Sequence, residues 1–79
     1  AQDDKQAVAW FQKAANQNHV GAQFNLGMMY ANGRGVAQDY QQAKIWWQKV
    51  LAQPDTKENA EARAFARDYL QKLSDVGIR

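Results

Sequence analysis

Apolar residues recur along this chain at intervals of three and four positions, the spacing of one face of an α-helix. Four stretches show this period, at about residues 3–17, 20–32, 39–52 and 57–73. Each is long enough for three or more helical turns, and polar residues occupy the positions between the apolar ones. The pattern therefore predicts an all-α fold of four helices, followed by a polar tail at 74–79 that frays.

Residues that favour helix ends stand between these stretches. Asp3 and Asp39 precede the first and third stretches, where an N-cap side chain is expected. Pro54 breaks the chain before the last helix, and Asp55 with Glu58 three residues later resembles a capping box that opens it.

Glycine and asparagine predict the turns. Asn18 stands where the left-handed conformation would end the first helix, and Gly33 and Gly35 supply positive-φ positions after the second. Gly27 lies inside the second helix, where glycine costs about 1 kcal/mol relative to alanine. Its presence is explained if another helix approaches the backbone closely.

An internal repeat appears at an offset of 36 residues. Residues 1–13 align with residues 37–49, and eight of these thirteen positions are identical. Trp10 and Trp46 correspond, and we expect them to occupy equivalent buried sites. The aligned apolar faces are Ala7, Trp10, Phe11 and Ala14 in one helix, and Ala43, Trp46, Trp47 and Val50 in the other.

The repeat carries a recognisable motif. Its positions are Ala22, Leu26, Gly27, Tyr30, Gly33, Gly35, Asp39, Ala43 and Trp46, with Trp10 at the matching place in the first helix. This motif resembles the Sel-1-like repeat, a relative of the tetratricopeptide repeat. The resemblance implies a right-handed α/α helix-hairpin solenoid, with a half repeat at 1–17, a full repeat at 20–52, a capping helix at 57–73 and a tail at 74–79. All of these would form one domain, 1–79.

The resemblance also implies a function. Sel-1-like repeats, many of them bacterial, serve as non-catalytic scaffolds or adaptors that bind a protein or peptide on the concave helix face. That face would be lined here by Phe24, Asn25, Met28 and Asn32, although Phe24 and Met28 could equally serve ordinary packing between helices. Two alternatives stay open: penicillin-binding or weak β-lactamase activity as in some secreted members, and a structural spacer within a longer array.

Composition narrows these choices. Cysteine is absent and histidine occurs once among 79 residues, so disulfides are excluded and we expect no metal or other cofactor. Ser74 lies in the predicted tail and is followed by Asp75, Val76 and Gly77, so it makes no Ser-x-x-Lys motif. The net charge of +2 is spread over mixed-sign residues, which argues against nucleic acid as partner. No apolar run is long enough for membrane insertion.

The two ends of the chain carry further expectations. No stretch resembles a signal peptide, while Ala1 and Gln2 are compatible with a mature terminus after signal cleavage, so periplasm and cytoplasm both stay open. The first helix should leave apolar surface around Val8, Phe11 and Ala15 uncovered. We expect a longer array to supply the missing neighbour, or two copies to self-associate through this N-terminal helix.

Overall fold

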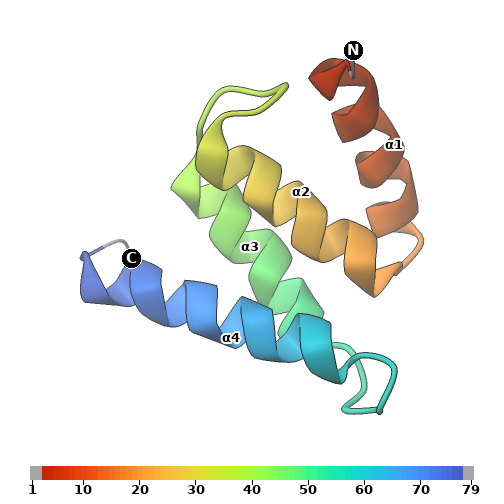
Figure 1. Ribbon diagram of the computed structural model, residues 1–79, viewed down its shortest axis with the longest axis vertical. Helices are drawn as coiled ribbons and strands as arrows, with labels where there is room; N and C mark the ends of the chain where they lie inside the picture. Colours follow the sequence, from red (N-terminus) through yellow and green to blue (C-terminus); the bar gives the residue numbers. More distant parts are fainter. Residues whose placement is uncertain (1–2, 78–79) are drawn as a thin grey trace.

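Four α-helices make up the computed structural model, which describes residues 3–77 (Figure 1). They are α1 (Asp4–Asn16), α2 (Val20–Asn32), α3 (Tyr40–Leu51) and α4 (Ala60–Asp75), and no strand occurs within this range. Helix α2 packs between α1 and α3, while α4 packs against α3 and, over a smaller area, against α2. The predicted all-α fold is confirmed. Ala1 and Gln2 of the internal repeat, and the last two residues of the predicted tail, lie outside the described residues.

The helix starts follow the predicted caps in α1 and α3. The Asp3 carboxylate accepts a hydrogen bond from the Lys5 amide at 2.9 Å, and Asp39 accepts one from the Gln41 amide at 3.0 Å. In α2 the cap is His19, whose Nδ1 accepts a hydrogen bond from the amide of Ala22 at 3.0 Å. Each cap satisfies an amide that has no partner within its own helix.

The predicted left-handed positions are also present. Asn18 has φ 67° after α1, and Gly33 has φ 66° at the end of α2. Gly35, with φ 74°, lies so close to α1 that a Cβ atom would come within 2.5 Å of the Asp4 carbonyl oxygen. Arg34 forms an ion pair with the Asp4 carboxylate at 3.2 Å beside this contact. The glycine turn therefore packs directly against the first turn of α1.

The core consists of two apolar clusters that α2 and α3 share. The first contains Ala15, Ala22, Leu26 and Trp46. The second extends from the end of α2 through α3 to α4 and contains Ala31, Ala43, Trp47, Val50, Ala66 and Leu73. The predicted apolar face of the third helix, with both of its tryptophans, is therefore buried.

The close approach predicted at Gly27 is present, and its partner is Trp47. A Cβ atom on Gly27 would lie 2.5 Å from the Trp47 Nε1 atom, well inside van der Waals contact. The indole ring is only 1% exposed, and its Nε1 donates a hydrogen bond to the Phe24 carbonyl at 3.3 Å. Glycine thus lets the Nε1 side of a large ring approach the backbone of α2.

The expectation that Trp10 and Trp46 are equivalently buried is wrong. Trp46 is 7% exposed, whereas Trp10 is 61% exposed. Trp46 packs in a cluster that includes residues of α1 and α2, but no described helix covers the corresponding side of α1. Trp10 contacts Phe11 edge-on instead, with ring centroids 5.3 Å apart. Whether a side chain at this position is buried depends on whether a neighbouring helix covers it, and the local sequence does not determine that.

The expectation that Val8, Phe11 and Ala15 form an uncovered apolar edge is also wrong. Ala15 is 2% exposed, and Val8 and Phe11 are half-buried against the first core cluster. These three side chains point to the α2 side of α1, where apolar partners are available. The exposed apolar surface of α1 is instead the Trp10 indole.

The last helix begins and ends later than predicted. It starts at Ala60, and the expected capping box of Asp55 and Glu58 does not form. The Thr56 hydroxyl accepts a hydrogen bond from the Asn59 amide at 3.3 Å, so a turn precedes the helix. At the other end α4 continues to Asp75, two residues into the stretch predicted as a frayed tail.

Arg63 explains why the α3–α4 loop is arranged in this way. Its guanidinium donates hydrogen bonds to the carbonyls of Leu51, the last residue of α3, and Gln53, which lies just beyond the helix. Asp55 forms an ion pair with the same guanidinium at 3.7 Å, and it does not cap the start of α4. An arginine of one helix therefore satisfies carbonyls at the C-terminal end of the preceding helix, where the helix dipole favours a cation.

Candidate functional site

The open face of α2 carries two hollows, one on each side. The first lies between the start of α2 and the start of α4 and has a volume of about 540 Å³. The second lies between α1 and α2 and measures about 240 Å³. Their described lining residues are His19, Val20, Gly21, Phe24, Asn25, Glu58, Glu61, Ala62 and Phe65 for the first, and Asp4, Ala7, Phe11, Asn25, Met28, Met29 and Arg34 for the second.

Three of the four residues predicted for the concave face line these hollows. Phe24 lines the hollow against α4, Met28 lines the one against α1, and Asn25 lines both. The fourth, Asn32, is exposed at the end of α2 but lines neither hollow. The side chain of Asn25 is exposed, so its amide is accessible to another molecule from either side.

Phe24 combines packing with partial exposure. Its ring is half-buried and lies 6.4 Å from the Trp47 ring, 5.8 Å from Tyr69 and 5.9 Å from Phe65, measured between centroids. Trp47 and Tyr69 stack at 5.2 Å beneath it. Such offset contacts make a rigid aromatic floor. Phe65 is the outermost ring of this cluster and is 45% exposed.

The larger hollow has a negative rim in a chain whose net charge is +2. Glu58 and Glu61 line it, and neither forms an ion pair with any residue of the described range 3–77. The described lining includes no lysine or arginine. His19 also lines this hollow; its Nδ1 accepts from the Ala22 amide, which leaves Nε2 as the ring nitrogen that can donate to another molecule.

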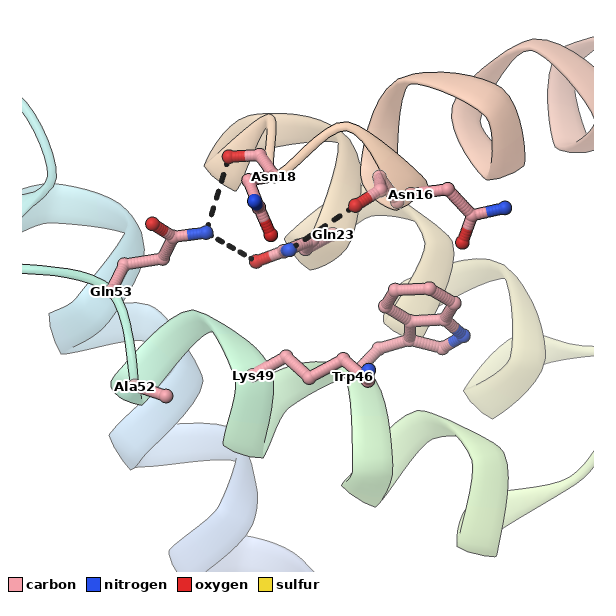
Figure 2. Close-up of a pocket in the computed structure, with 8 residues that line it drawn as sticks. Asn16, Asn18, Gln23, Trp46, Lys49, Ala52 and Gln53 are labelled. Atoms are coloured by element: carbon pink, nitrogen blue, oxygen red, sulfur yellow. Dashed lines mark hydrogen bonds between the residues drawn. The ribbon is translucent and has the colours of Figure 1, made fainter.

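A third cavity, of about 340 Å³, opens between the end of α1 and the end of α3 (Figure 2). Gln23 is 3% exposed and donates to the Ala15 carbonyl at 3.3 Å, while its own carbonyl oxygen accepts from Gln53 at 3.2 Å. Gln53 also donates to the Asn18 carbonyl at 3.1 Å. These bonds tie the α1–α2 turn to the end of α3, so the polar groups here serve the fold.

Lys49 lies at the opposite wall of this third cavity. Its ammonium is 5.2 Å from the centroid of the Trp46 ring, within the range of a cation–π contact. The contact places the lysine over the core ring and away from the face of α2 that carries the other two hollows. The third cavity is therefore separate from the surface that the sequence predicts for binding.

The described part of the chain offers little support for a metal site, a membrane-spanning helix or an activated serine. Within residues 3–77 there is no group of three or more side chains placed to hold a metal ion. Among the same residues no helix is both long and apolar enough to cross a membrane. Ser74 is exposed in the last turn of α4.

Sequence reasoning missed the contribution of α4 and its preceding loop. The apolar period of the last helix places Phe65 on its buried face, and Glu58 was expected in a capping box. A usable signal existed, since Glu61 and Phe65 are four residues apart and must share a helix face. Their placement opposite Phe24, however, depends on how α4 packs across α2.

Comparisons with known proteins agree with this architecture. The model of the Sel1 repeat matches residues 1–19 and 20–55. The chitin synthase regulator SKT5 of Saccharomyces cerevisiae is 33% identical over 55 residues, which is 70% of this chain but 8% of the yeast protein. No solved structure gave a significant match. Because the repeat model covers more than half of the sequence, and the helices pack as stacked pairs, this chain belongs to the Sel1 repeat family of protein–protein interaction modules.

Proposed function

We propose that this domain is a scaffold that binds a partner protein through an extended peptide segment that crosses the open face of α2. The observation that carries the proposal is the pair of hollows that share Asn25. A segment crossing α2 at Asn25 would reach both hollows with successive side chains. The yeast relative is named as a regulator of chitin synthase, and binding to another protein is compatible with that role.

The chemistry of the three central side chains suits a peptide. The Asn25 amide can donate to and accept from a peptide backbone, which pairs with it in either direction. Met28 is flexible and polarisable, so it adapts to irregular apolar side chains. Phe24 is fixed by its aromatic neighbours, so little of its freedom is lost on binding. The surface thus combines one rigid, one adaptable and one polar contact.

Substitution of Asn25 by arginine tests this proposal. Peptides selected from a display library against the whole 79-residue chain should bind with measurable fluorescence anisotropy. Asn25→Arg should weaken them at least about tenfold, which is about 1.4 kcal/mol, because a long charged side chain would fill the crossing point of both hollows at the centre of the proposed interface. Gln48→Arg is the matched control, an equally exposed position on α3.

The control should bind like the parent chain, and circular dichroism should show that both variants keep their helices. If Asn25→Arg binds every selected peptide as tightly as Gln48→Arg, the face of α2 is not the binding surface. A chain that selects no peptide at all would favour the spacer alternative.

We also propose that α1 self-associates through Trp10. A tryptophan that is 61% exposed on a helix leaves a large apolar surface in water, and a second copy could cover it. Sedimentation equilibrium over a concentration series should show a reversible dimer. Trp10→Glu should abolish it without loss of helicity. A parent chain that stays monomeric at millimolar concentration would refute the proposal.

A further inference from the structure

The larger hollow differs from the rest of the surface in both charge and shape. It combines an exposed aromatic ring, Phe65, with two carboxylates, Glu58 and Glu61, that have no ion-pair partner within the described residues. The net charge of +2 is spread over residues of both signs, whereas the described lining of this hollow carries two carboxylates and no lysine or arginine. A pocket of this kind selects a ligand that is apolar at its centre and positive at its edge.

We propose that this hollow between α2 and α4 binds a large apolar side chain of a partner peptide, flanked by lysine or arginine. This inference rests on the proposed peptide-binding function and assigns the chemical class of the segment bound. The apolar side chain would lie against Phe24 and Phe65, and the neighbouring cations would face Glu58 and Glu61.

The geometry of the floor supports an apolar anchor. Phe24 and Phe65 have ring centroids 5.9 Å apart with planes tilted by 35°, so they form an open wedge. Val20 and Ala62 add apolar surface around these rings. A volume of about 540 Å³ is large enough for one leucine or phenylalanine side chain together with part of its backbone. Covering the exposed part of Phe65 would remove apolar area from water.

The charges decide which partner is favoured. Two unpaired carboxylates repel phosphate groups, which disfavours nucleic acid and anionic lipid. A guanidinium or ammonium beside the apolar anchor would lie opposite Glu58 or Glu61 and raise the rate of encounter. His19 contributes an Nε2 donor at the same wall, which suits a carbonyl of the bound backbone.

The probes for this inference are three synthetic nine-residue peptides with blocked ends and identical Gly-Ser flanks. Their central tripeptides are Arg-Leu-Arg, Glu-Leu-Glu and Arg-Ser-Arg. Each is titrated into the ¹⁵N-labelled chain, and amide shifts are followed by NMR, which detects even millimolar binding. The Arg-Leu-Arg peptide should bind best and shift the amides around Phe24, Glu61 and Phe65. The other two should bind at least about fivefold more weakly, since each lacks one of the two contacts.

Charge reversal gives the sharper comparison. Glu61→Lys should weaken the Arg-Leu-Arg peptide by about fivefold or more and strengthen the Glu-Leu-Glu peptide, because the sign of the rim changes. Asp68→Lys is the matched control, the same charge change at an exposed position on α4 outside the hollow. It should leave both affinities within about twofold. Added salt should weaken the Arg-Leu-Arg peptide in the parent chain more than in the Glu61→Lys variant.

The outcomes separate this inference from the function on which it rests. If the peptides shift only amides near Met28 and Arg34, the assignment to the α2–α4 hollow is overturned while the α2 face stands as a binding surface. Equal affinities for the arginine and glutamate peptides would overturn the charge selection in the same way. If neither these probes nor display-selected peptides shift any amide of α2, both proposals fail.

Discussion

Replacing Trp47 with alanine is expected to destabilise the fold by about 3–5 kcal/mol. The indole is 1% exposed and joins α2, α3 and α4 through its contacts with Gly27, Phe24 and Tyr69. Truncation would leave a ring-sized cavity and remove the hydrogen bond from Nε1 to the Phe24 carbonyl. Since a domain of this size has a total stability of only about 4–12 kcal/mol, Trp47→Ala should unfold at far lower urea concentration.

Trp10→Ala is the internal control for this loss. The side chain is mostly exposed, so its removal should change the free energy of unfolding of the monomer by about 0.5 kcal/mol or less. Urea denaturation followed by circular dichroism at low protein concentration measures both variants. Similar losses for Trp10 and Trp47 would mean that α1 is covered by another helix, contrary to the structure.

Replacing Gly27 with leucine is expected to cost about 1–3 kcal/mol by overpacking, toward the upper end of that range. Even a single Cβ atom would lie 2.5 Å from the Trp47 ring, which is buried and held by its Nε1 hydrogen bond to the Phe24 carbonyl. The better helix propensity of leucine, a gain of up to about 1 kcal/mol, offsets only part of this cost. Thermal melts of the variant should show a clearly lower Tm.

Gly21 offers a matched comparison on the same helix. Its Cβ atom would meet the exposed His19 ring at 3.2 Å, so the ring must shift by a few tenths of an ångström while its Nδ1 keeps the bond to the Ala22 amide. Gly21→Ala should therefore be neutral or stabilise by up to about 1 kcal/mol, whereas Gly27→Ala should destabilise. A Gly27→Ala variant that melts at or above the parent chain would show that the close approach to Trp47 does not exist.

The helices could be predicted because their signals are local. Apolar period, the aspartate caps at Asp3 and Asp39 and the left-handed turn at Asn18 all act within a few residues. The start of α4 could not be predicted in the same way. It depends on Arg63, which reaches back ten or more residues to the carbonyls at the end of α3 and draws Asp55 toward itself.

The exposure of Trp10 could not be predicted from local sequence either. Its sequence surroundings nearly repeat those of Trp46, yet one ring is exposed and the other is buried. Periodicity identifies which face of a helix is apolar, but the neighbouring helix decides whether that face is covered. The division of the chain into a half repeat, a full repeat and a capping helix stays a prediction for the same reason.

The candidate site was predictable where it lies on one helix. Phe24, Asn25 and Met28 follow from their register on α2 and from the resemblance to the Sel-1-like repeat. The acidic and aromatic wall supplied by Glu61 and Phe65 was not, because it is formed by tertiary packing of α4 against α2 and α3. Sequence alone thus indicated two residues of the larger hollow, Phe24 and Asn25, both of them on α2.

Isotope-filtered NMR on the labelled chain with a display-selected, unlabelled peptide tests directly whether the face of α2 binds a peptide segment of a partner protein. Binding at this face should give intermolecular NOEs from the peptide to the side chains of Phe24, Asn25 and Met28. Ile45, which is 44% exposed on α3, serves as an apolar reference on another helix. NOEs to Ile45 in place of the α2 side chains would contradict the account.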